Sequence, residues 1–68
     1  MEEFKLNSPY ITLGQLLKAA DFIGTGGEQK EFLARAKVVI NGMLDNRRGR
    51  KLVVGDIIKI GKREIQIT

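Results

Sequence analysis

The sequence predicts a small α+β fold in which two N-terminal helices pack on an antiparallel sheet. Apolar residues recur at helical spacing in the first half, whereas the second half has short β-branched runs separated by glycine turns. A chain of 68 residues has room for one domain, 1–68, and buries only about 60% of the surface that its unfolded form exposes. We expect an arm at residues 1–11, a core at 12–60 and a last strand at 61–68.

The sequence of the arm predicts a short edge strand and little other regular structure. Phe4 and Leu6 alternate as in a strand, and Pro9 would end it. Tyr10 and Phe4 are isolated aromatic residues. Packing explains them better than stacking on nucleic-acid bases, because no aromatic residue is interleaved with the basic stretch of the chain.

The first helix is expected at residues 13–21. Thr12 and Gln15 have the spacing of a capping box, in which each side chain bonds the backbone N–H of the other residue. Apolar residues then recur at the spacing that places them on one helical face: Leu13, Leu16, Leu17 and Ala20. Gly24 follows as a stop signal.

The second helix is expected at residues 26–36, after Thr25 and Glu28 repeat the capping pattern. Four of its residues would share one face: Gln29, Phe32, Leu33 and Ala36. The short connection implies that the two helices pack antiparallel or at a steep angle. Gly26 and Gly27 could offer backbone N–H groups to an anion, but the segment matches no phosphate-loop template, and an ordinary tight turn explains it better.

The second half of the chain predicts a small meander of strands. The β-branched run 38–40 leads directly into Asn41 and Gly42, a pair typical of a hairpin turn with two residues at positive φ. Residues 43–45 would return as the partner strand. The rest follows in order: a turn at 54–56, a strand at 57–60, a turn at 61–63 and a strand at 64–68.

Composition argues against most enzyme classes. The chain has no cysteine and no histidine, so it lacks the commonest metal ligands and the commonest general base. Asp45 and Asp56 occupy turn positions, where local hydrogen bonding explains them. We therefore expect no enzyme, no cofactor, no metal and no small-molecule substrate. No signal peptide or apolar run of membrane-spanning length is visible, which predicts a cytoplasmic protein without a membrane partner.

Charge is distributed unevenly along the chain. The net charge is +4, yet residues 1–31 hold three cations against five acids, and residues 32–68 hold nine cations against three acids. The sharpest concentration is NRRGRK at residues 46–51, with four cations around Gly49 in an expected loop. Arginine forks match phosphate oxygens, so this stretch indicates nucleic-acid binding more than a solubilising surface. Repulsion between these charges would be relieved when a nucleic acid docks.

The order of motifs resembles the RNA-binding domain named after protein four of the small ribosomal subunit, the S-four domain, and especially its short stand-alone bacterial members. The motifs are TGGE at 25–28, VVING at 38–42, RRGRK at 47–51 and VGDII at 54–58. The resemblance covers about residues 12–60. It implies two helices against a small curved antiparallel sheet, the alpha-L motif, which grips structured RNA with basic side chains.

The resemblance also implies which residues bind RNA. The cations are Lys30, Lys37, Arg47, Arg48, Arg50 and Lys51. Asn41 and Gly42 would shape the hairpin, and helix geometry alone adds Arg35. The expected partner is structured RNA, ribosomal or transfer RNA. Two alternatives remain: a DNA-binding or general nucleic-acid protein, and a protein-interaction module whose basic loop meets an acidic partner. The chain could also recruit a protein partner that acts in trans.

Overall fold

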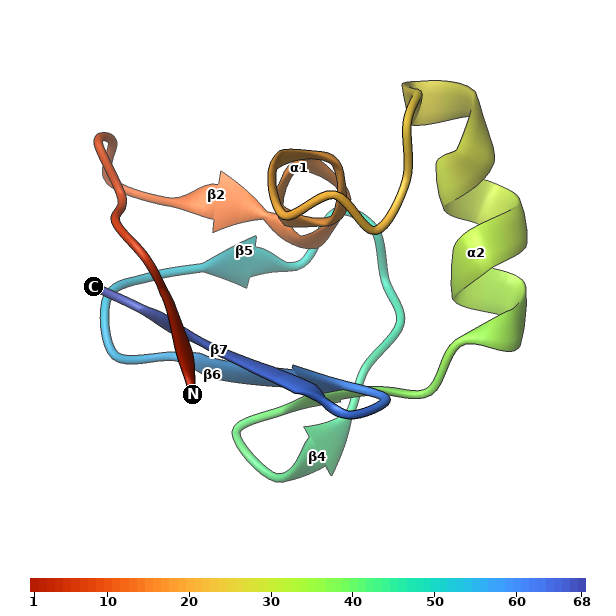
Figure 1. Ribbon diagram of the computed structural model, residues 1–68. Coiled ribbons are helices and arrows are strands. Elements are labelled where there is room, and N and C mark those ends of the chain that lie inside the picture. The colour runs from red at the N-terminus through yellow and green to blue at the C-terminus, as the bar shows by residue number, and fades with distance from the viewer.

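Two layers enclose the core of the computed structural model, which describes residues 1–68 (Figure 1). A five-stranded sheet forms one layer. Helix α1 (Leu13–Ala19) and a two-stranded ladder form the other, and α2 (Gln29–Arg35) stands at the side. The strands are β1 (Glu2–Phe4), β2 (Ile11–Thr12), β3 (Val38–Ile40), β4 (Met43–Leu44), β5 (Lys51–Leu52), β6 (Ile57–Ile60) and β7 (Arg63–Ile67). No helix has the length and apolar character needed to cross a membrane.

The five-stranded sheet has the order β1-β7-β6-β3-β4, and it is antiparallel except at one edge. There β1 pairs parallel to β7, with Glu2 opposite Ile65 and Phe4 opposite Ile67. The expectation of a purely antiparallel sheet behind two leading helices therefore needs correction. Two strands, β1 and β2, precede α1. The edge strand expected around Phe4 is present as β1, which pairs with β7 at the edge of the sheet.

Helix α1 forms as its sequence pattern predicts, but it ends early. The capping box between Thr12 and Gln15 is present in both directions, and the three leucines of the apolar face are fully buried. The helix ends at Ala19, before the expected residue 21. The chain turns away at Asp21, whose φ of 66° lies in the left-handed region that Asp tolerates, so Gly24 is not the residue that stops the helix.

Helix α2 begins differently from the prediction. Thr25 makes no capping hydrogen bond to the backbone, and the chain enters through a 3-10 helix, η1 (Gly26–Glu28). The residue that precedes α2 is Glu28, so the second capping box does not form. The predicted shared face of α2 is confirmed as its inner face: Leu33 is buried, and Gln29, Phe32 and Ala36 are half-buried.

The hairpin turn is confirmed by its backbone angles. Asn41 and Gly42 have φ values of 52° and 85°, and Ile40 lies opposite Met43 across the turn. By contrast, β5 was not expected. Its Leu52 lies opposite Ile11 of β2 and is fully buried, so the end of the NRRGRK stretch is part of a strand rather than a loop.

The core is wholly apolar. Twelve hydrophobic residues are buried, and no polar or charged side chain is buried with them. They lie on α1, α2, β3, β5, β6 and β7, and in the turn at Ile23. The ladder of β2 and β5 belongs to this core through Leu52 and the half-buried Ile11. The segment that joins β4 to β5 is thereby held next to α1.

Candidate nucleic-acid interface

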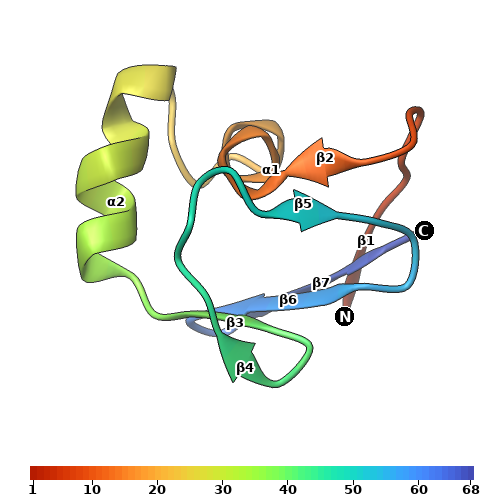
Figure 2. The same cartoon turned by 180° about the vertical axis from the view of Figure 1, so that it is seen from behind.

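The basic loop, residues 46–51, is anchored to α1 through its backbone. The N–H of Leu13 donates to the carbonyl of Arg50 at 2.8 Å, and the N–H of Gly14 donates to the carbonyl of Arg48 at 2.9 Å. The first N–H groups of a helix have no partner within the helix, so these carbonyls satisfy them. Figure 2 shows the segment between β4 and β5 passing between α2 and α1. The backbone of the loop therefore has a fixed path, which also fixes the points from which its basic side chains extend.

Asp45 neutralises part of the loop. Its carboxylate accepts hydrogen bonds from Arg47 Nε at 3.0 Å and Nη2 at 2.8 Å, from the Arg47 backbone N–H at 3.1 Å, and from Arg50 Nη1 at 2.8 Å. The Asp45 side chain is only 11% exposed. The bonds from the Arg47 side chain, followed by its backbone N–H, hold the pKa of Asp45 well below its ordinary value of 3.8. An acid of the chain itself thus relieves part of the repulsion that we expected a nucleic acid to relieve.

Lys30 and Arg48 line the same hollow. It measures about 470 Å³, and its other lining residues are Leu33, Ala34 and Asn46. Asn46 Nδ2 donates to the Leu33 carbonyl at 3.4 Å, which joins the basic loop to α2. Neither Lys30 nor Arg48 forms an ion pair with an acid of the chain. Their charges are therefore available to an external anion.

Lys37 extends this surface toward the sheet. It lines a hollow of about 310 Å³ together with Arg35, Asp45 and Asn46, and a second of about 230 Å³ together with Lys59. Sequence reasoning missed Lys59. The strand alternation of residues 57–60 could have marked it, because Lys59 points away from the buried face that carries Ile58 and Ile60.

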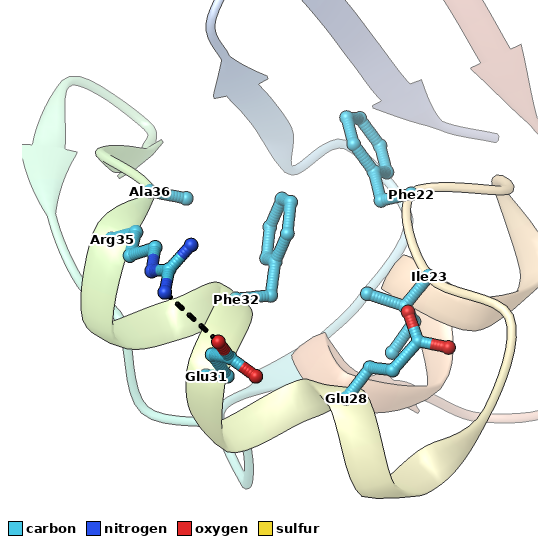
Figure 3. Close-up of a pocket in the computed structure, with 7 residues that line it drawn as sticks. All are labelled: Phe22, Ile23, Glu28, Glu31, Phe32, Arg35 and Ala36. Atoms are coloured by element: carbon cyan, nitrogen blue, oxygen red, sulfur yellow. Dashed lines mark hydrogen bonds and ion pairs between the residues drawn. The ribbon is translucent and has the colours of Figure 1, made fainter.

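The other face of α2 has a different character. An open hollow of about 400 Å³ lies here. Figure 3 shows Phe22 and Phe32 among its lining residues. Their ring centroids are 5.9 Å apart. Glu28 and Glu31 also line the hollow, and Glu31 accepts a hydrogen bond from Arg35 Nη2 at 2.9 Å. Arg35 therefore lies at the border between a basic and an acidic face, and its guanidinium forms an ion pair with Glu31.

The side-chain amide of Asn41 forms hydrogen bonds within the chain through both its nitrogen and its oxygen. Its Nδ2 donates to Asp56 Oδ1 at 2.9 Å, and its Oδ1 accepts the backbone N–H of Ile57 at 2.9 Å. Asp56 also accepts the N–H of Val53 at 2.9 Å. Asn41 thus ties the hairpin turn to the start of β6, in keeping with a role in shaping the hairpin, which Gly42 shares at the tip.

Gly26 and Gly27, the candidate backbone anion site, lie beside an acidic side chain. Gly26 and Gly27 are exposed in the 3-10 helix, where Thr25 Oγ1 donates to the Glu28 carboxylate at 3.4 Å. An acid of the chain is thus already present where an anion would bind. No three acidic side chains lie close enough together to hold a metal ion.

Lys51 is placed apart from the rest of the loop. It begins β5, and its Nζ lies 4.8 Å from the centroid of the Tyr10 ring, which is 43% exposed. Sequence reasoning attributed Tyr10 to packing. No local signal connects it with the basic loop, because only the pairing of β2 with β5 brings the two residues together.

Comparison with known proteins agrees with this architecture. The sequence model of the S4 domain matches residues 4–68. A curated relative, the probable ribosome maturation protein RlbA of Bacillus subtilis (strain 168), is 53% identical over 55 residues, which are 81% of this chain and 78% of the relative. With a match that spans nearly all of its residues, the chain belongs to the S4 domain family.

Proposed function

We propose that the protein is a non-catalytic module that binds structured RNA through the basic loop and the face of α2 that carries Lys30. The observation that carries the proposal is the hollow lined by both Lys30 and Arg48, two cations from distant parts of the sequence without acidic partners. Phosphate contacts of this kind supply most of the affinity for nucleic acid and fix the orientation of the protein.

Structured RNA suits this surface better than DNA. An A-form RNA duplex presents phosphates and 2′-hydroxyls over a shallow minor groove, and its major groove is too narrow for side chains to read. The basic surface combines one face of the short helix α2 with a loop of fixed path, which suits phosphates displayed on both sides of a shallow groove. The name of the Bacillus subtilis relative refers to ribosome maturation, which favours ribosomal RNA as the ligand.

The test is fluorescence anisotropy with an RNA hairpin and a DNA duplex of equal length, each titrated over a series of salt concentrations. We expect the RNA to bind more tightly. Arg48→Ala should weaken binding and reduce the salt slope by about 0.7–0.9, the loss of one phosphate contact. Lys30→Ala should act in the same way.

Lys5→Ala is the matched control. It removes the same charge from the exposed Lys5, which follows β1 at the opposite edge of the sheet from β4, and it should leave the slope unchanged. Equal affinity for RNA and DNA would favour a general nucleic-acid protein. If neither ligand binds at low salt, or Arg48→Ala binds as the wild type does, the proposal is wrong, and an acidic protein becomes the partner to seek.

A further inference from the structure

A tyrosine and a lysine lie on one outward face at the ladder of β2 and β5: Tyr10, directly before β2, and Lys51 of β5. Thr12 lies opposite Lys51, and Ile11 lies opposite Leu52. Leu52 and Ile11 point into the core, so the side chains that alternate with them, including Tyr10 and Lys51, point outward. Lys51 lies over the ring, as described above. The only tyrosine of the chain is thus exposed beside the basic loop.

A hollow of about 550 Å³ lies beside this ring. It is lined by Ser8, Pro9, Tyr10, Ile11, Gln15 and Ala19. Gln15 Oε1 is used by the capping box, where it accepts the N–H of Thr12 at 2.9 Å, but Gln15 Nε2 makes no hydrogen bond within the chain. The Ser8 hydroxyl donates to the Tyr10 carbonyl at 2.8 Å and keeps its lone pairs as acceptors.

We propose that this hollow binds one unpaired nucleobase of the RNA, stacked on the Tyr10 ring. A flat aromatic face, an amide donor and a hydroxyl acceptor are the groups that recognise a base which has left its stack. Gln15 Nε2 donates to an oxygen or ring nitrogen of the base, and the Lys51 ammonium binds the phosphate of the same nucleotide. Exposed cation–π contacts are weak, so a phosphate can draw Lys51 away from the ring.

The inference rests on the proposed function and narrows it. A base inside a duplex is stacked on both faces and cannot reach a tyrosine ring. The preferred ligand is therefore a duplex with an unpaired nucleotide, such as a bulge or a loop, next to the stem that the basic loop binds. Phosphate contacts alone would not distinguish such an RNA from a fully paired one.

The experiment compares two RNA hairpins with the same stem, one fully paired and one with a single bulged 2-aminopurine. Three proteins are tested: the wild type, Tyr10→Phe, which keeps the ring, and Tyr10→Leu, which keeps only apolar volume. We expect the wild type and Tyr10→Phe to bind the bulged hairpin more tightly and to lower the 2-aminopurine emission. Tyr10→Leu should lose affinity for the bulged hairpin by about 5- to 150-fold, the range for one stacked base, while its affinity for the paired hairpin stays unchanged.

Arg48→Ala separates this inference from the proposed function, because it should weaken the binding of both hairpins equally. The quenching by wild-type protein needs no variant, so a folding defect in Tyr10→Leu leaves that readout intact. If the wild type binds both hairpins equally and does not change the emission, the base site is absent although RNA binding stands. If neither hairpin binds, both proposals are overturned.

Discussion

Replacing Asp45 by Asn is expected to destabilise the fold and strengthen RNA binding. Asp45 accepts hydrogen bonds from Arg47 and Arg50. Asparagine keeps an oxygen for the Arg47 backbone N–H but loses the charge. The path of the loop should survive, because its backbone bonds to Leu13 and Gly14 do not involve Asp45. Two arginine side chains then become available to phosphates without a change in where the loop lies.

The loss of stability and the gain in RNA binding can each be estimated. Hydrogen bonds to a charged partner contribute about 1.5–3 kcal/mol and neutral ones about 0.5–1.5. Arg47 is 71% exposed, so solvent screens its part of the interaction, and we expect a loss of about 1 kcal/mol in the free energy of unfolding. For a domain of this size that lowers Tm by about 4–8 °C. Each arginine that gains a phosphate contact steepens the salt slope by about 0.7–0.9.

The assay combines thermal unfolding with the salt series of RNA binding. Glu3→Gln is the control, since it removes the same charge from an exposed position on β1, at the opposite edge of the sheet from β4. It should change neither Tm nor the slope. A variant Asp45→Asn that is less stable and also binds RNA more weakly at low salt would refute the reasoning. The carboxylate would then be needed to orient the arginines for RNA.

Asp45 also makes stability depend on pH. Its pKa in the folded protein lies below the ordinary value of 3.8, so its contribution is complete above that pH and is lost as the pH falls further. Denaturation midpoints measured between about pH 5 and pH 2 should therefore fall more steeply for the wild type than for Asp45→Asn. Parallel curves would show that the ion pairs with Arg47 and Arg50 contribute little.

Three further predictions concern the scaffold. Asn41→Ala removes the bonds that tie the hairpin to Asp56, so urea denaturation should show a loss of about 1–3 kcal/mol, with unchanged RNA affinity for the folded fraction. Leu52→Ala empties a fully buried position and should cost about 2–5 kcal/mol, seen as lost circular dichroism at room temperature. Arg63 hydrogen-bonds Glu2 and lowers its pKa, so Arg63→Ala should return that pKa toward 4.5 in an NMR titration; an unchanged pKa would contradict the pairing.

Two of the three local signals were confirmed, whereas the capping pattern of Thr25 and Glu28 did not form. The capping box at Thr12 and the turn at Asn41 depend on residues within a few positions of each other, and both are present. The ladder of β2 and β5 could not be predicted in this way. Each strand has two residues, too few for a period, and the partners are far apart in the sequence. The parallel pairing of β1 with β7 has the same cause, because it joins the two ends of the chain.

The candidate site likewise has features with a local sequence signal and features without one. The cluster of cations was visible, and so was the possibility that α2 adds Lys30 to it. The pairing of Asp45 with Arg47 had a local signal, since Asp commonly bonds the backbone N–H two residues on. The bond from Arg50 had none, because it requires the loop to fold back onto Asp45. Sequence counting therefore overstates the free charge of the loop.

That overstatement can be measured as a salt slope. Seven cations of the predicted RNA surface would give a slope of about 4.9–6.3 if each met a phosphate, and affinity would fall about 900- to 6000-fold between about 50 and 200 mM salt. The structure pairs Arg35, Arg47 and Arg50 with acids. The four without such partners, Lys30, Lys37, Arg48 and Lys51, give a slope of about 2.8–3.6 and a fall of about 50- to 150-fold. A measured slope near the larger value would mean that RNA displaces Asp45 and Glu31 from their arginines, whereas the smaller value would mean that these ion pairs persist in the complex.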